Sequence, residues 1–225
     1  TEDEHFDSFA AMYYEELEKL YGKAKYYSMD PFHEGGNTEG VDLAKAGTSI
    51  MGAMKKANPE AVWVMQAWQA NPREAMVNTL DSGDLLVLDL YSEKLPQWGD
   101  PESMWYREKG FGKHDWLYCM LLNFGGNVGL HGRMEQLVNG YYNACAHING
   151  KTLRGVGATP EGIENNPMMF ELLYELPWRE ERFSPDIWLQ GYLKARYGGE
   201  LSPEVMEAWR ALEHTVYNAP KNYQG

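Results

Sequence analysis

The sequence has few cysteines and few basic residues. It contains only Cys119 and Cys145 in 225 residues. Two cysteines are too few for a disulfide framework, and neither lies in a Cys-x-x-Cys metal pair. The 20 Lys and Arg residues are outnumbered by 33 Asp and Glu, which gives a formal net charge of −13. Because basic residues supply most of the affinity for a phosphate backbone, we expect no nucleic-acid partner.

Long apolar runs and cofactor motifs are also missing. The strongest apolar runs, at 61–68 and 84–91, are under half the length of about 20 residues that crosses a bilayer, so we expect no membrane insertion. The acidic opening TEDEHFDSFA is unlike a signal peptide. His33-Glu34 lacks the second histidine of a zinc-protease motif, and the glycine-rich segments have the wrong spacing for a dinucleotide loop or a P-loop. We therefore expect neither a metal nor a cofactor.

What the sequence does contain is a regular alternation of two kinds of segment. Five short runs rich in aliphatic, aromatic and β-branched residues occur at 25–29, 61–68, 84–91, 115–122 and 153–158. Most are apolar on both faces, which is typical of buried parallel strands. Segments of helical period lie at 2–21, 41–58, 72–80, 129–148 and 167–176. The pattern predicts an α/β fold with a parallel sheet, either an open doubly wound sheet or part of an eightfold barrel.

The character of the chain changes near Ser184. The rest of the sequence contains two amphipathic segments, each opened by Ser-Pro, with no strand pattern between them. Serine is a good N-cap and proline a good first helical residue. We therefore predict an α/β region over residues 1–183 and an all-helical region over 184–225.

In either architecture, active sites form at the carboxyl ends of parallel strands. In this sequence those ends carry polar or aromatic residues beside glycines and no cluster of Lys or Arg. This favours an uncharged, hydrogen-bonding ligand with an apolar face, and a sugar fits best. The residues that we select as candidates are His33, Glu34, Trp68, Tyr91, Asn123 and Glu161.

Two of these candidates are carboxylates. Glu34 and Glu161 each follow a predicted strand and each precede a glycine, which lets the backbone turn closely around a ligand. A single loop glutamate is ordinarily solvated. In an eightfold barrel, however, the first and fifth strands of this segment lie opposite each other. The two carboxylates would then face each other across the barrel mouth, as glycoside hydrolysis requires.

Five segments carry a resemblance to a known family. They are YSMDPFHEGGN, VWVMQAW, LLVLDLYSE, WLYCMLLNFGGNVGLHG and GVGATPEGIENNPMMFELLYELPWR, in that order. Together they resemble the catalytic region of the alpha-N-acetylglucosaminidases, glycoside hydrolase family 89, from Tyr21 to Tyr217. NFGGN and PEGIENN are the most specific. The sequence departs from some relatives at His33, where they have asparagine, and at Leu122, where they have histidine.

The resemblance implies a retaining exo-hydrolase that removes terminal α-linked N-acetylglucosamine from glycans. It implies that Glu34 is the general acid/base and Glu161 the nucleophile, with carboxyl groups about 5–5.5 Å apart. We place His33, Trp68, Tyr91 and Asn123 against the sugar. The implied fold is the later part of a (β/α)8 TIM-type barrel, followed by the start of an all-helical domain.

The family also implies features that lie outside the printed residues. Its members are far longer, so the opening strands of the barrel would come from an N-terminal part of the same enzyme. Their substrates imply an extracytoplasmic location, whether secreted, periplasmic or lysosomal. Whether the glycan is of heparan type or mucin type stays open.

Two other hypotheses remain. One is a non-catalytic carbohydrate-binding fragment, which the presence of both glutamates disfavours because a binder has no need of them. The other is an open α/β domain of unrelated function.

Overall fold

A computed structural model describes residues 1, 3–34, 36–162 and 166–220 of the chain. Its centre is a single parallel sheet with the strand order β1-β2-β3-β4-β5. The strands are β1 (Tyr26–Ser28), β2 (Val62–Ala67), β3 (Leu85–Asp89), β4 (Asp115–Leu122) and β5 (Leu153–Pro160). Spatial order follows chain order without a reversal, which is the winding of a (β/α)8 barrel. A doubly wound sheet reverses its order at a switch point. The strand order therefore identifies the sheet as part of a (β/α)8 barrel, a choice that the length of the chain left open.

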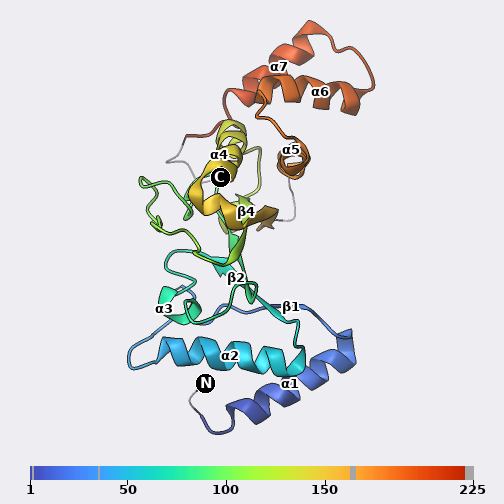
Figure 1. The fold of residues 1–225 in the computed structure, drawn as a ribbon. Coiled ribbons are helices and arrows are strands. Elements are labelled where there is room, and N and C mark those ends of the chain that lie inside the picture. Colours follow the sequence, from blue (N-terminus) through green and yellow to red (C-terminus); the bar gives the residue numbers. More distant parts are fainter. Residues whose placement is uncertain (2, 35, 163–165, 221–225) are drawn as a thin grey trace.

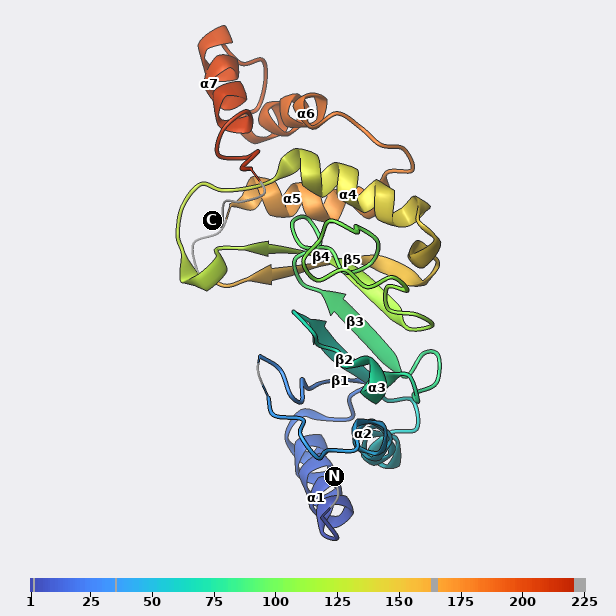
Figure 2. The same ribbon diagram turned by 90° about the vertical axis from the view of Figure 1, so that its left-hand side faces the viewer.

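Helices lie at both ends of the row of strands. Figures 1 and 2 show α1, α2 and α3 near β1 and β2, α4 and α5 beside β4 and β5, and α6 and α7 beyond α4. Their bounds are α1 Phe6–Tyr21, α2 Leu43–Ala57, α3 Glu74–Val77, α4 Met134–Ala146, α5 Pro167–Glu175, α6 Pro185–Tyr197 and α7 Pro203–Glu213. Three short 3-10 turns cover Phe124–Gly126, Ile148–Thr152 and Leu176–Trp178. The fold class is the predicted one.

Two predicted helices differ from those found. The helix expected over 72–80 is shortened to the four residues of α3, since Asn78 and Thr79, which are poor helix formers, begin the turn toward Gly83. The opening helix forms, but it contains no fully buried residue. Its expected apolar face is mostly uncovered: Phe9 is 70% exposed and Leu20 73% exposed.

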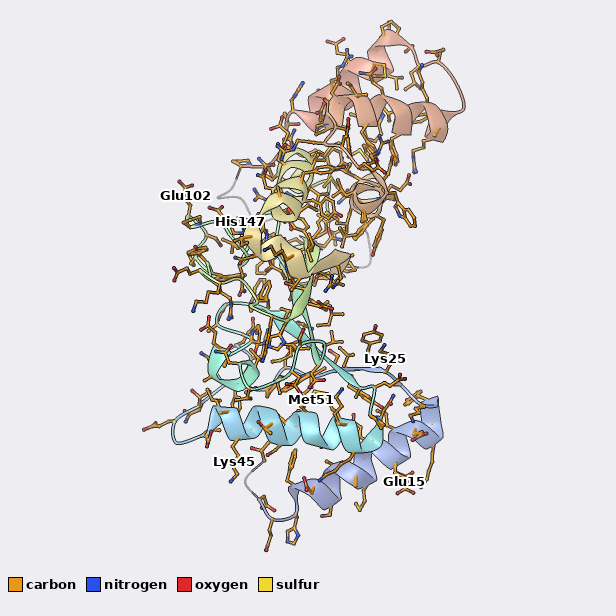
Figure 3. All side chains as sticks on the ribbon, viewed as in Figure 1. Glu15, Lys25, Lys45, Met51, Glu102 and His147 are labelled. Atoms are coloured by element: carbon orange, nitrogen blue, oxygen red, sulfur yellow. The ribbon has the colours of Figure 1, made fainter. Side chains whose placement is uncertain are left out.

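The helix α2 shows why these segments fold as they do. The Asp42 side chain caps its first turn by accepting a hydrogen bond of 3.0 Å from the Lys45 backbone N–H. Ile50 and Met54 are buried and belong to the same apolar cluster as the buried strand residues. In Figure 3, Met51 lies on the side of α2 turned toward the sheet and Lys45 on the opposite side. The helix is therefore held by one apolar face.

The two faces of the sheet differ in burial. Trp63, Met65 and Val87 are completely buried, and they share the apolar cluster with residues of α2 and α4. The intervening residues, such as Val64 and Leu86, are only half-buried. The sequence predicted strands buried on both faces. This is wrong for the second face of β2 and β3, whereas Cys119 and Leu121 of β4 are buried on that face too. Its apolar residues point away from the helices, to the side that a closed barrel encloses.

A long connection takes the place of a helix between β3 and β4. Within it, the Trp98 ring stacks on Trp116 at the start of β4, with centroids 6.1 Å apart and planes 21° apart. The Trp116 indole N–H donates a hydrogen bond of 3.0 Å to the Asn149 carbonyl oxygen. Trp116 is completely buried, so it joins the connection, the sheet and the segment after α4.

Replacing Trp116 by alanine should lower the free energy of unfolding by about 3–5 kcal/mol, because it leaves a large cavity and an unpaired carbonyl. Urea denaturation checks this value. Ile187→Ala, at a position 69% exposed, is the control and should change stability by less than about 0.5 kcal/mol. Equal stabilities of the two variants would contradict the proposed anchoring role.

Two buried carboxyl groups lie where β3 ends. Asp89 accepts a hydrogen bond of 2.8 Å from the Ser92 hydroxyl, and Glu93 accepts one of 3.2 Å from the Leu121 backbone N–H. Burial raises the pKa of Asp89 to about 7 and the pKa of Glu93 to about 8. These hydrogen bonds oppose the effect of burial without cancelling it.

The raised pKa of Glu93 makes stability depend on pH. A glutamate in the unfolded chain has a pKa of about 4.3. Between that pH and about 8, Glu93 is therefore deprotonated in the unfolded chain and still protonated in the folded chain. Stability should therefore fall as the pH rises through this window, and Glu93→Gln should show a shallower fall. Melting temperatures between pH 5 and pH 8 check this prediction, with the exposed Glu102→Gln as control. Parallel curves for Glu93→Gln and the unaltered protein would contradict it.

Candidate active site

Backbone strain concentrates in the loops at the carboxyl end of the sheet. Among the described residues, the non-glycine residues with positive φ are Phe32 (60°), Glu34 (46°), Gln69 (54°) and Asn123 (58°). They follow β1, β2 and β4. Such conformations cost on the order of 1–3 kcal/mol in most residues and cluster at functional sites, although asparagine tolerates them better. Backbone geometry thus marks the same edge of the sheet as the sequence did.

Three aromatic rings from three loops form what we call the aromatic platform: Trp68, Tyr91 and Phe124. Trp68 and Tyr91 have centroids 6.4 Å apart and planes 11° apart. Phe124 is 5.8 Å from Trp68 and 6.4 Å from Tyr91. The edge of Trp105 packs against Trp68, with centroids 4.5 Å apart. The platform is a firmly packed apolar wall whose members follow β2, β3 and β4.

Glu161 lies beside this platform. Its side-chain Oε2 accepts a hydrogen bond of 2.6 Å from the Gly125 backbone N–H, and its own backbone N–H donates to the Leu122 carbonyl oxygen at 3.1 Å. Gly125 has a φ of 68°, which glycine adopts without strain. Glu161 is exposed. The structure therefore presents an oriented carboxylate that solvent and ligand can reach.

Burial and neighbouring charges change the pKa of the Tyr91 phenol. Burial, chiefly, together with the nearby charge of Glu93, raises the pKa of Tyr91 to about 12, and the charge of Glu161 adds to the rise. The positive charge of Arg133 opposes the rise. Tyr91 is 2% exposed. It was predicted to contact a sugar, and in this structure it is a buried neighbour of Glu161.

The NFGGN and PEGIENN segments fit against each other. Asn123, 1% exposed, lies so close to Gly162 that a Cβ on this glycine would come 2.9 Å from the Asn123 amide nitrogen. A second contact between the two segments is the hydrogen bond from the Gly125 backbone N–H to the Glu161 carboxylate. Residues 163–165 of the second segment lie outside the described residues. The contacts give a physical reason for the two motifs to occur together.

The loop after β1 is fixed to the end of β2. The Asp30 carboxylate accepts hydrogen bonds from the Gln66 backbone N–H at 2.7 Å and from the Asn71 amide at 3.1 Å. His33 is half-buried, and its Nε2 finds no partner in the described part of the chain. Glu34 is exposed. Gly35, which follows it, is outside the described residues.

The candidates thus fall into two groups. Contacts bring together Trp68, Tyr91 and Glu161, while Asn123 lies against the loop of Glu161. His33 and Glu34 lie after β1, which together with β5 forms the two edges of the sheet. The catalytic roles of Glu34 and Glu161 and the sugar contacts of the other four candidates stay predictions.

Sequence reasoning missed three residues of the site. Phe124 lies inside the specific NFGGN segment and could have been selected on that ground. Trp105 occurs in a segment without periodic pattern, so no sequence signal marks it. Arg133 lies inside the segment of helical period at 129–148, but that pattern does not mark it as a buried residue. Arg133 is 2% exposed, and a completely buried arginine is rare enough to be informative once a structure is known.

The described residues contain no group of three or more His, Cys, Asp or Glu side chains able to hold a metal ion. Nor does any helix within the described ranges have the length and apolar character needed to cross a membrane.

Comparison with known proteins gives matches along nearly the whole chain. Residues 1–180 match the family model described as alpha-N-acetylglucosaminidase (NAGLU) tim-barrel domain. Residues 188–225 match the C-terminal domain of the same family. Human alpha-N-acetylglucosaminidase is 35% identical over 230 residues, covering 96% of this chain and 30% of the human protein.

Solved structures agree. The family 89 glycoside hydrolase from Clostridium perfringens in complex with PUGNAc superposes with a TM-score of 0.86 at 33% identity, over 98% of this chain and 24% of that one. A variant of the enzyme with two glutamates replaced by glutamine gives the same values, in complex with its substrate GlcNAc-alpha-1,4-galactose. The chain spans about a third or less of the length of these relatives. It belongs to the alpha-N-acetylglucosaminidase family, glycoside hydrolase family 89.

Proposed function

We propose that this chain carries the active-site edge of a retaining exo-glycoside hydrolase that removes terminal α-linked N-acetylglucosamine. The observation that carries the proposal is the exposed Glu161 carboxylate, fixed by the Gly125 N–H beside an aromatic platform. An oriented carboxylate next to stacked rings suits a reaction at the anomeric carbon of a sugar. The substrate class rests on the family and on the disaccharide bound by the Clostridium relative.

In the proposed reaction Glu161 is the nucleophile. Its free oxygen attacks the anomeric carbon while Glu34, protonated at this stage, gives its proton to the leaving glycosidic oxygen. Glu34 then takes a proton from water, and the hydroxide formed displaces Glu161 from the sugar. Two inversions give net retention. The Gly125 N–H occupies one carboxylate oxygen of Glu161 and so orients the other.

The remaining candidates would bind the sugar. Trp68, half-buried with an indole N–H that has no acceptor in the described part of the chain, supplies both an apolar ring and a donor. The buried Nε2 of His33 has no hydrogen-bond partner among the described residues, and a sugar hydroxyl is a suitable partner for it. Tyr91 and Asn123 complete the predicted set, Tyr91 as support for the platform.

The chain is shorter than its relatives and contains five strands, fewer than the eight of a closed barrel. A five-stranded portion leaves inner apolar residues such as Val64 and Leu86 half-buried, and we propose that further strands of the same enzyme close the barrel. We propose the division into residues 1–183 and 184–225 and an extracytoplasmic location on the basis of the family.

Glu161→Gln, made in the full-length protein that contains this chain, should lower kcat on an aryl α-N-acetylglucosaminide to background, because an amide is a poor nucleophile. The unaltered protein should form a covalent adduct at Glu161 with a mechanism-based fluoro-sugar. The matched control is Glu39→Gln, an exposed glutamate, which should be as active as the unaltered protein. Near-normal turnover by Glu161→Gln would refute the proposal, and binding without hydrolysis or adduct would indicate a carbohydrate-binding module.

Glu34→Gln should lower kcat by about 10²–10⁴-fold on substrates with poor leaving groups, the usual contribution of a general acid. Substrates with good leaving groups need less protonation, so their first step should suffer less. Following the product anomer by NMR checks the stereochemistry, and the α-anomer should appear first. A β-anomer product, or an equal loss for both kinds of leaving group, would contradict the role given to Glu34.

A further inference from the structure

Two residues close part of the long connection between β3 and β4 (green in Figure 2) into a loop. The Arg107 guanidinium donates a hydrogen bond from Nε to the Gln97 side-chain oxygen at 2.6 Å. The Arg107 backbone N–H donates a second one to the Gln97 carbonyl oxygen at 3.0 Å. We call this pair of residues the loop lock. Because both hydrogen bonds join the same two residues, the ends of the segment 97–107 have a fixed distance and orientation.

The loop lock is buried and rests on the end of β3. Gln97 is completely buried, and its backbone N–H donates a hydrogen bond of 3.2 Å to the Asp89 carboxyl group. The Arg107 side chain is only 10% exposed. A hydrogen bond from a charged group is stronger than one between neutral groups, and losing it here would leave a buried amide oxygen unpaired. The loop therefore has a firm base at the strand end that Tyr91 follows.

Trp105 lies within the closed loop. It belongs to a turn in which the Tyr106 backbone N–H donates to the Ser103 carbonyl oxygen at 3.1 Å. Its ring packs against Trp68, with centroids 4.5 Å apart and planes 63° apart. Only one residue separates Trp105 from Arg107, so the loop lock limits how far the Trp105 ring can move.

Trp68 depends on this neighbour for its orientation. Its indole N–H has no acceptor in the described part of the chain, so no hydrogen bond fixes the ring. The rings of Tyr91 and Phe124 are nearly parallel to it, at 11° and 26°, and parallel rings can slide past one another. A ring at a steep angle opposes that sliding, and Trp105 is such a ring.

We propose that Gln97 and Arg107 are positioning residues of the active site: they hold Trp105 against Trp68 and so set the orientation of the ring that binds the sugar. The inference rests on the proposed function, in which Trp68 contacts the sugar. It gives the connection that takes the place of a barrel helix a part in substrate binding, although neither residue of the loop lock touches the substrate.

Trp105→Ala, made in the full-length protein that contains this chain, tests the contact with Trp68. The variant should raise KM about 2–10-fold at nearly constant kcat, because the loss of one aromatic contact weakens substrate and transition state equally. The inhibition constant of PUGNAc, the ligand of the Clostridium relative, should rise by a similar factor. Trp178→Ala, at a position 87% exposed, is the control and should change neither constant.

A double-mutant cycle tests the loop lock. Gln97→Met keeps the size of the side chain and removes the acceptor, so KM and the inhibition constant should rise by at most the factor found for Trp105→Ala. Combined with Trp105→Ala it should add nothing, because the lock acts through Trp105. Gln97→Glu restores an acceptor for Arg107, and both constants should lie below those of Gln97→Met. If Gln97→Met does not fold, Arg107→Lys takes its place in the cycle, since lysine cannot reproduce the planar guanidinium.

The outcomes separate the inference from the proposed function. In an active unaltered protein, full binding by Trp105→Ala or additive effects in the cycle overturn the inference and leave the proposed function standing. A lock variant with a lower melting temperature and unaltered KM shows a purely structural role, which also overturns it. An unaltered protein without glycosidase activity overturns the proposed function and the inference together. Coupled rises of KM and of the inhibition constant support both.

Discussion

The register between β4 and β5 is the constraint on which the candidate active site depends. Leu122 is paired with Pro160 at the end of the two strands, so the next residues, Asn123 and Glu161, leave the sheet side by side. The Gly125 N–H then meets the Glu161 carboxylate, and Gly162 meets the Asn123 side chain. A slip of one residue would turn each side chain to the opposite face and remove these contacts together.

The winding of the sheet extends this constraint to the whole site. Since all five strands run parallel and in chain order, every loop that follows a strand opens at the same edge. Trp68, Tyr91 and Phe124 reach one platform from three such loops, although 23 and 33 residues separate them in the sequence. Local strain at Phe32 and Glu34 lies at this edge too. The regular strands of the sheet therefore hold the loops in which the strained residues lie.

Patterns with a local cause could be predicted from the sequence, and contacts between distant segments could not. The apolar runs identified all five strands, and the position of Glu161 after the last run identified the carboxylate that the structure orients. Arg133 escaped notice because the Ala219 carbonyl that accepts its hydrogen bond lies 86 residues away. The exposed face of α1 has a similar cause: Phe9 has the spacing of a core residue, yet periodicity does not reveal what covers a helix.

Residues 216–219, which follow α7, hydrogen-bond Gly132 and Met134 at the start of α4, and this contact bears on the order in which the chain folds. A chain is synthesised from its N-terminus, so Ala219 emerges 86 residues after the arginine that it holds. The sheet, α4 and α5 precede residues 216–219 in the sequence, and domains commonly form while synthesis continues. The five strands of the sheet are therefore synthesised before the carbonyl that accepts the hydrogen bond of the buried Arg133 guanidinium.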